Sequence, residues 1–225
     1  YKRQGLGNLD LGITAETLRR AAGAAARELS GNKTSAFALS HKSVIELAAI
    51  AEGAALGAYT FTEFLGSKKS EQKAPLSNIS VVSKFADTAQ AKDAIKRAEI
   101  IADQTALVRD LINTPPSHLT PDSFCLRMKK EASKYGVKVE IFNDAALRKG
   151  GYGGIIGVGQ GSANPPRLLH VSYSPTKAKK RFAFVGKGIT FDTGGLALKP
   201  ALGMEAMKSD TVSYTHLRAH ETDSY

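Results

Sequence analysis

The chain has 225 residues, of which 42% are hydrophobic and 23% are charged, a composition typical of a soluble globular protein with one large or two small domains. A single cysteine, Cys125, excludes an internal disulfide and predicts a reducing, cytoplasmic setting. No apolar run is long enough to cross a membrane, and the first residues do not resemble a secretory leader, so we expect neither.

The net charge of +10 predicts a basic surface. Such a surface can attract nucleic acid or anionic substrates, or it can be a solvated, lysine-rich exterior without a specific partner. The basic residues are scattered along the chain and are not interleaved with aromatic residues. We therefore expect the solvated exterior, and we find no nucleic-acid recognition motif.

Helical and strand-like segments alternate in the first part of the chain. In chain order, we expect a helix over 14–29, a short strand near residue 37, a helix over 42–58 and a strand over 79–83. Thr14 can cap the first helix, although Thr17 stands where a complete capping box would have Glu or Gln. We expect a linker between two structural units near residues 86–93.

The second part predicts further alternation. In chain order, we expect a helix over 89–112, a helix from about residue 122, a strand over 137–142, a short helix over 144–151, and strands over 167–175 and 181–191. Pro115 and Pro116 end the long helix. Residues 151–166 predict a glycine-rich turn region with a small strand inside it. This alternation predicts an α/β fold with helices on both faces of a sheet.

The segment "FAFVGKGITF" (182–191) is almost wholly apolar around Lys187, which predicts a strand buried on both faces. Asp192, Lys199 and Asp210 follow it. The residue types leave two interpretations open. The first is a set of surface ion pairs beside a glycine-rich loop. The second is a metal-assisted hydrolase site, with Lys187 as a neutral amine ligand and the aspartates as oxygen ligands.

Other motifs predict no chemistry. The glycines of "GVGQG" (157–161) do not have the dinucleotide-loop spacing, and "GKGIT" (186–190) lacks the first glycine of a phosphate-binding loop, so we expect structural turns in both places. His118 and His170 are interpreted as structural histidines. His216 and His220 lie four residues apart, but the glutamate of a zinc-peptidase motif is missing after the first of them, so we expect no zinc site there.

Four segments together resemble the leucyl (cytosol) aminopeptidases, the di-metal peptidases of the M17 class. The segments are "VGKGITFDTGGLALKP" (185–200), "GMEAMKSD" (203–210), "NTPPSHLTP" (113–121) and "GVGQGSANPPRLLHVSY" (157–173). They follow the order and spacing of the family, and the resemblance covers residues 5–210.

The resemblance implies a smaller amino-terminal α/β domain over residues 1–88 and the first part of a mixed-sheet α/β catalytic domain, with helices on both faces, over 89–210. It implies a cytoplasmic homo-hexamer that removes amino-terminal, leucine-type residues from peptides. Two divalent metal ions are implied as cofactors, Mn or Zn, with Mg or Co as alternatives. No membrane partner is implied.

The family's residue roles transfer to four positions. Lys187 resembles the lysine ligand of one metal, Asp192 the carboxylate that bridges both metals, and Asp210 a further ligand of the lysine-bound metal. Lys199 resembles the catalytic lysine that polarises the scissile carbonyl and stabilises the oxyanion. The two lysines would then need opposite protonation states, one neutral as a ligand and one charged as an electrophile.

The family pattern stops at Asp210, and no Asp-x-Glu-x-Arg group, which supplies further ligands and an arginine in the family, occurs in the chain. We expect a carboxy-terminally truncated fragment in which residues 211–225 are a non-native tail. For this chain alone we predict weak metal binding and little or no peptidase activity. The alternative function is DNA binding or a non-catalytic assembly role.

Overall fold

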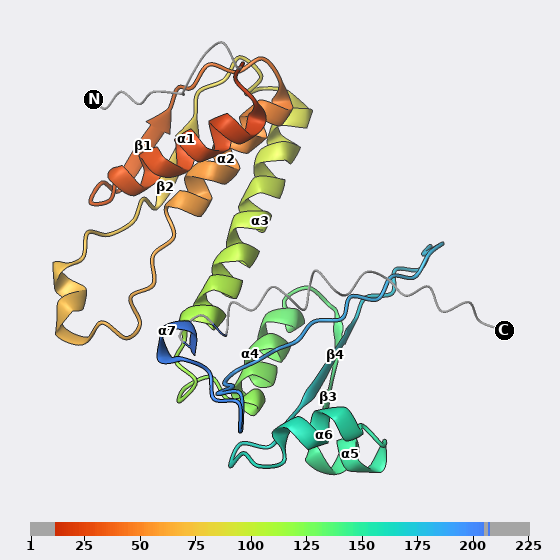
Figure 1. The fold of residues 1–225 in the computed structure, drawn as a ribbon. Helices are drawn as coiled ribbons and strands as arrows, with labels where there is room; N and C mark the ends of the chain where they lie inside the picture. The colour runs from red at the N-terminus through yellow and green to blue at the C-terminus, as the bar shows by residue number, and fades with distance from the viewer. Residues whose placement is uncertain (1–11, 205–206, 208–225) are drawn as a thin grey trace. The chain divides into compact units, whose positions relative to one another are not determined.

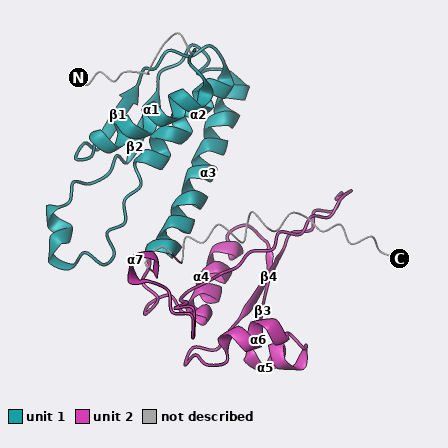
Figure 2. Cartoon of the chain, in the orientation of Figure 1, with its two compact units in different colours: residues 1–113 teal, residues 114–225 magenta. Residues whose placement is uncertain are grey.

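The computed structural model describes residues 12–204 and Met207 (Figure 1). The chain divides into two compact units, unit 1 from Tyr1 to Asn113 and unit 2 from Thr114 to Tyr225 (Figure 2). The long helix Ala89–Asn113 falls in unit 1 by this division, whereas the sequence predicts that it belongs to the second domain. The domain boundary after residue 88 stays a prediction. None of the helices in the described part combines the length and apolar character needed to cross a bilayer.

The described residues of unit 1 form three longer helices, two short strands and one 3-10 turn. In chain order these are α1 (Ala15–Glu28), β1 (Thr34–Phe37), α2 (Val44–Gly57), η2 (Gly66–Glu71), β2 (Asn78–Val81) and α3 (Ala89–Asn113). The two strands pair in parallel, with Thr34 opposite Asn78 and Phe37 opposite Val81. The Thr14 hydroxyl accepts a hydrogen bond from the Thr17 N–H, which confirms the predicted cap of α1.

The core of unit 1 lies where α1 and α2 cross. Leu18 of α1 and Ile50 of α2 are fully buried, and Phe37 of β1 belongs to the same hydrophobic cluster. The crossing is close because glycines line it. A Cβ atom on Gly53 would lie 2.1 Å from the Arg19 carbonyl oxygen, and one on Gly57 would lie 2.2 Å from the Gly23 carbonyl oxygen. No side chain fits in that space, so the sequence must keep glycine there.

Unit 2 has shorter elements. In chain order these are α4 (Pro121–Ser133), β3 (Lys138–Phe142), α5 (Asp144–Lys149), α6 (Gly153–Gly159), β4 (Leu168–Ser172) and α7 (Ala201–Met204). β3 and β4 are antiparallel, with Lys138 opposite Ser172 and Phe142 opposite Leu168. Leu147 of α5 is fully buried, and Cys125 of α4 is 2% exposed. The described residues thus confirm a mixed α/β fold.

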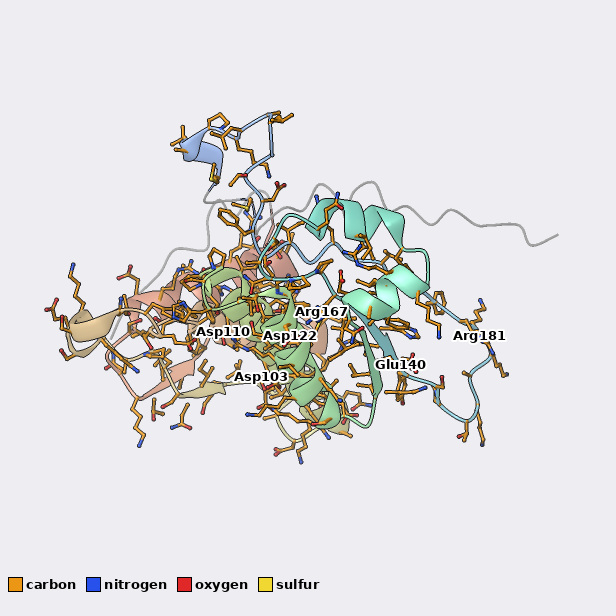
Figure 3. All side chains as sticks on the ribbon, turned by 90° about the horizontal axis from the view of Figure 1, so that it is seen from below. Asp103, Asp110, Asp122, Glu140, Arg167 and Arg181 are labelled. Carbon is orange, nitrogen blue, oxygen red and sulfur yellow. The ribbon has the colours of Figure 1, made fainter. Side chains whose placement is uncertain are left out.

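An ion pair connects the starts of α4 and β4. Arg167 Nε donates to Asp122 Oδ1 at 2.9 Å, and Figure 3 shows the two side chains beside each other. The same guanidinium also donates to the backbone carbonyls of Pro165 and Pro166. The planar fork of arginine can reach these separate acceptors at once, so Arg167 anchors the turn that leads into β4.

Two predicted strands of unit 2 are wrong. The small strand expected within 151–166 is replaced by helix α6, which follows α5 after the turn at Gly151 and packs against it. Tertiary contact with α5 overrides the strand preference of the β-branched residues Ile155, Ile156 and Val158.

The expected strand over 181–191 is also absent from the structure. That segment has no strand geometry, and Phe184 within it is 96% exposed. In the described part, β3 and β4 pair only with each other, so residues 181–191 have no neighbouring strand. An apolar sequence forms a strand only where a second strand accepts its backbone hydrogen bonds.

Candidate functional site

The loop from Asp192 to Lys199 closes on itself through three polar contacts. Lys199 Nζ donates to Asp192 Oδ2 at 2.8 Å. The Gly194 N–H donates to the other carboxylate oxygen, Asp192 Oδ1, at 2.8 Å, and the Lys199 N–H donates to the Thr193 carbonyl oxygen at 2.8 Å. The structure therefore brings together two of the four residues predicted for the site.

Glycine is required at position 194 for this loop to form. Gly194 has a φ of +91°, in the left-handed region that favours glycine. A Cβ atom there would also lie 2.3 Å from the Ala197 carbonyl oxygen. Only a residue without a side chain can turn the chain here and still point its N–H at the Asp192 carboxylate.

The electrostatics of the loop favour a charged Asp192. The hydrogen bond from Lys199 and the one from the Gly194 N–H hold the pKa of the Asp192 carboxyl below its usual range, and the positive charges of Lys199 and Lys187 act in the same direction. The side chains of Asp192 and Lys199 are 39% and 37% exposed. Water reaches both groups, so their attraction is screened and modest.

Lys187 does not lie in the environment that the sequence predicts. It is exposed, because the segment around it forms no buried strand. Its charge still contributes to the lowered pKa of Asp192, which places its ammonium within electrostatic reach of that carboxylate. Asp210, the fourth predicted site residue, lies outside the described residues, as do His216 and His220.

A divalent metal would find only part of a ligand set here. No group of three or more His, Cys, Asp or Glu side chains that could hold a metal occurs among residues 12–204 and Met207. Asp192 offers the hard carboxylate oxygens that divalent cations prefer, and Lys187 can add an amine once it loses its proton. These two residues fit a metal as the described portion of a larger set.

The two structural histidines each have a polar contact. His118 Nδ1 lies 3.0 Å from Ser117 Oγ in the loop before α4. His170 on β4 lies 3.2 Å from Glu140 Oε2 on β3, the side chain labelled in Figure 3. Hydrogen bonds from Lys138 and from His170 lower the pKa of the Glu140 carboxyl. Neither histidine belongs to the Asp192 loop in these contacts.

A serine and histidine pair in unit 1 is not predicted from the sequence. His41 Nε2 lies 2.7 Å from Ser83 Oγ, and His41 Nδ1 lies 2.8 Å from the Leu39 carbonyl oxygen. Residues 41 and 83 come together because they follow the neighbouring ends of β1 and β2. No motif spacing could have revealed this contact. The His41–Ser83 contact joins the two strand ends, and the Ser83 oxygen also accepts a hydrogen bond from the Phe85 N–H.

Family comparison accounts for both parts of the chain. The catalytic-domain model of the cytosol aminopeptidase family matches residues 106–213, and the amino-terminal-domain model of the same family matches residues 5–68. The chain belongs to the cytosol aminopeptidase family. The family resemblance inferred from the four sequence segments is thereby confirmed, and the catalytic-domain match includes Lys187, Asp192, Lys199 and Asp210.

Curated relatives in the cytosol aminopeptidase family are closely similar in sequence. A probable cytosol aminopeptidase of Streptomyces avermitilis is 48% identical over 198 residues, which are 87% of this chain and 39% of the relative. One from Rhodococcus opacus is 47% identical over 92% of this chain and 41% of the relative. The chain therefore spans about two fifths of the length of these relatives.

Solved structures show the same fold. The bottromycin maturation enzyme BotP in complex with Mn matches with a TM-score of 0.73 and 33% identity, over 88% of this chain and 42% of that one. The leucyl aminopeptidase from Leishmania major in complex with actinonin matches with a TM-score of 0.72 and 28% identity, over 88% and 39% of the two chains. The alternative of a DNA-binding or assembly role gains no support from these comparisons.

Proposed function

We propose that the protein is a metal-dependent aminopeptidase that hydrolyses leucine-type amino-terminal residues from peptides. The observation that carries the proposal is the Asp192–Lys199 ion pair within the segment that the catalytic-domain model matches. Leucyl aminopeptidases among the similar solved structures support the same reaction. Because the chain spans about two fifths of its relatives, the reaction is proposed for the protein with a complete site.

Lys187, Asp192 and Asp210 are the residues that would hold divalent metal, with Mn or Zn favoured and Mg or Co as alternatives. Bound there, a pair of such ions would supply a hydroxide at neutral pH and a Lewis acid for the substrate carbonyl. The manganese in the BotP structure is consistent with this choice, although it is a property of that protein.

The chain's own residues have separate tasks in this proposal. Asp192 presents charged oxygens, since its pKa is held low by Lys199 and the Gly194 N–H. The Lys199 ammonium offers positive charge to the oxyanion that forms when the peptide carbonyl becomes tetrahedral. Lys187 serves as a ligand in its neutral form. The glycine turn at 194 keeps Asp192 and Lys199 on one loop, so both can face the same substrate carbonyl.

Partners and setting belong to the same proposal. The substrates are peptides with a free amino terminus, the assembly is a homo-hexamer, and the compartment is the cytoplasm. The family name supports the last of these.

The test is a chimera in which residues 12–204 of this chain replace the matching segment of the Streptomyces avermitilis relative, with the unaltered relative as a reference. We expect the chimera to hydrolyse leucine p-nitroanilide when Mn²⁺ is added, and the 225-residue chain alone to show little or no turnover. Lys199→Ala in the chimera should lower kcat by about 10²–10³-fold, the usual cost of removing a group that stabilises an oxyanion.

Lys177→Ala is the matched control, because Lys177 is an exposed lysine of unit 2 outside the loop. It should change kcat by less than about twofold. A chimera that folds but has no activity, or one whose activity survives Lys199→Ala, would contradict the proposed function.

A further inference from the structure

We propose that Lys199 competes with the metal for Asp192. In the metal-free protein its ammonium holds the carboxylate, and it is released toward the substrate when a divalent cation takes that carboxylate. The inference rests on the proposed function, and it adds that metal loading controls when Lys199 becomes available.

Both oxygens of Asp192 accept hydrogen bonds from within the loop. Oδ2 accepts from Lys199 Nζ at 2.8 Å, and Oδ1 accepts from the Gly194 N–H at 2.8 Å. A dication that binds Oδ2 would compete with the ammonium for the same oxygen, and the two positive charges repel. Asp192 can therefore serve the cation fully only after Lys199 has moved away.

The local charge also opposes entry of a cation while Lys199 stays in place. The positive charges of Lys187 and Lys199 both act on the negative Asp192 carboxylate. The net charge of these three side chains is therefore about plus one. Departure of the Lys199 ammonium removes one of the two repelling charges.

The geometry lets Lys199 leave without unfolding the loop. Its backbone N–H is held by the Thr193 carbonyl oxygen, and that bond does not depend on where the side chain points. The Lys199 side chain is 37% exposed, so its ammonium can exchange Asp192 for water at small cost. The long flexible stem of lysine allows the swing, whereas the short Asp192 side chain stays fixed by Gly194.

The size of the competition follows from the strength of the pair. For an exposed ion pair of this kind, the paired form is about one and a half to five times as populated as the unpaired form. Because the metal binds only the unpaired form, the apparent metal affinity is lowered by about two- to sixfold. By reciprocity, metal binding should break the Lys199–Asp192 pair, and the fraction of broken pairs should rise with the metal concentration.

The first experiment measures Mn²⁺ binding to the 225-residue chain from the loss of the free-ion electron paramagnetic resonance signal. Lys199→Met removes the ammonium and keeps an unbranched side chain, so it should tighten Mn²⁺ binding by about two- to sixfold. Lys177→Met removes the same charge from an exposed site in unit 2 and should leave the affinity unchanged.

The second experiment tests the pair without metal. Acetic anhydride modifies free amines, and mass spectrometry reports the extent at Lys199 relative to Lys177. We expect Lys199 to react more slowly than Lys177 in the metal-free chain. Asp192→Asn should raise the relative reactivity of Lys199, and Mn²⁺ should raise it in the unaltered chain.

The outcomes separate this inference from the proposed function. If Asp192→Asn leaves Lys199 reactivity unchanged, or if Lys199→Met binds Mn²⁺ no more tightly than the Lys177→Met control, competition is overturned while metal-dependent hydrolysis stands. A third outcome is that Mn²⁺ binds none of these proteins, although Asp192→Asn still raises the reactivity of Lys199. The Lys199–Asp192 pair would then exist, but Asp192 would not bind a metal in this chain, and the proposed competition would be overturned.

Discussion

The α1–α2 crossing and the segment 181–200 are stabilised in opposite ways. At the crossing, Leu18 and Ile50 are fully buried and backbone touches backbone at Gly53. In the segment, Phe184 is 96% exposed, and the loop is held by a few hydrogen bonds and one ion pair. The crossing contributes most of the stability of unit 1, whereas the segment carries the proposed site residues and contributes little stability.

The difference follows from how each contact is stabilised. Apolar burial and close packing contribute several kcal/mol at a single position, about 2–5 for a buried leucine. A partly exposed hydrogen bond or ion pair contributes about 1 kcal/mol or less. The site loop can therefore rearrange around a ligand without disturbing the core, and substitutions in the two regions should have very different effects.

The largest effect is expected at the helix crossing. Gly53→Ala would place a Cβ atom 2.1 Å from the Arg19 carbonyl oxygen, and only separation of the two helices can relieve that overlap. We expect the free energy of unfolding of unit 1 to fall by about 3 kcal/mol or more, measured by urea denaturation followed by circular dichroism.

Gly157→Ala is the matched control in α6 of unit 2. An added Cβ there has no neighbour within 4 Å. Because alanine favours helix over glycine, this change should be neutral or stabilising by up to about 1 kcal/mol. Similar losses for Gly53→Ala and Gly157→Ala would mean that the crossing is not as close as the structure shows.

A buried and an exposed apolar side chain give a second contrast. Leu18→Ala leaves a cavity in the core of unit 1, where Leu18 is fully buried, and should lower the free energy of unfolding by about 2–4 kcal/mol. Phe184→Ala removes a larger side chain that contacts mainly water, and its effect should stay within about 0.5 kcal/mol. A loss above 1.5 kcal/mol for Phe184→Ala, about three times that bound, would show that residues 181–191 are packed in solution.

The smallest effect concerns the pH dependence of α1. Hydrogen bonds from Arg20 and Arg19 lower the pKa of the Glu16 carboxyl in the folded state. A lowered folded pKa stabilises the protein above the usual glutamate pKa, and this stabilisation is lost as pH falls through the lowered value. Glu16→Gln should therefore lower the thermal midpoint at pH 7 slightly, and the difference from the unaltered chain should disappear at strongly acidic pH.

Glu63→Gln makes the same charge change at an exposed position of unit 1 and serves as the control. A difference between Glu16→Gln and the unaltered chain that stays constant down to the lowest pH would argue against the ion pairs of Glu16.

Sequence reasoning predicted most of unit 1 and less of unit 2. The helices α1, α2 and α3 and the strands β1 and β2 lie within a few residues of their predicted ranges, because apolar periodicity and a capping threonine are local signals. The strand over 181–191 was wrong because its formation depends on a neighbouring strand, which a local pattern does not contain.

The candidate site was partly predictable for a similar reason. Asp192 and Lys199 lie seven residues apart on one loop, so a motif could identify both, and the structure joins them. Lys187 is exposed, and its apolar neighbours could not reveal this, because burial requires partners that lie far away in sequence. The His41–Ser83 contact joins residues 42 positions apart and has no local signature at all.

The rate at which the single cysteine, Cys125, reacts with a thiol reagent can report local opening of the structure around α4. It is 2% exposed, and burial raises the pKa of the thiol, so both access and the reactive thiolate are scarce while unit 2 stays closed. A disulfide reagent can reach this sulfur only through openings of the surrounding structure, and its rate therefore reports their equilibrium population. The reactivity of Cys125 thus reports local opening of unit 2, and the measurement does not depend on catalytic activity.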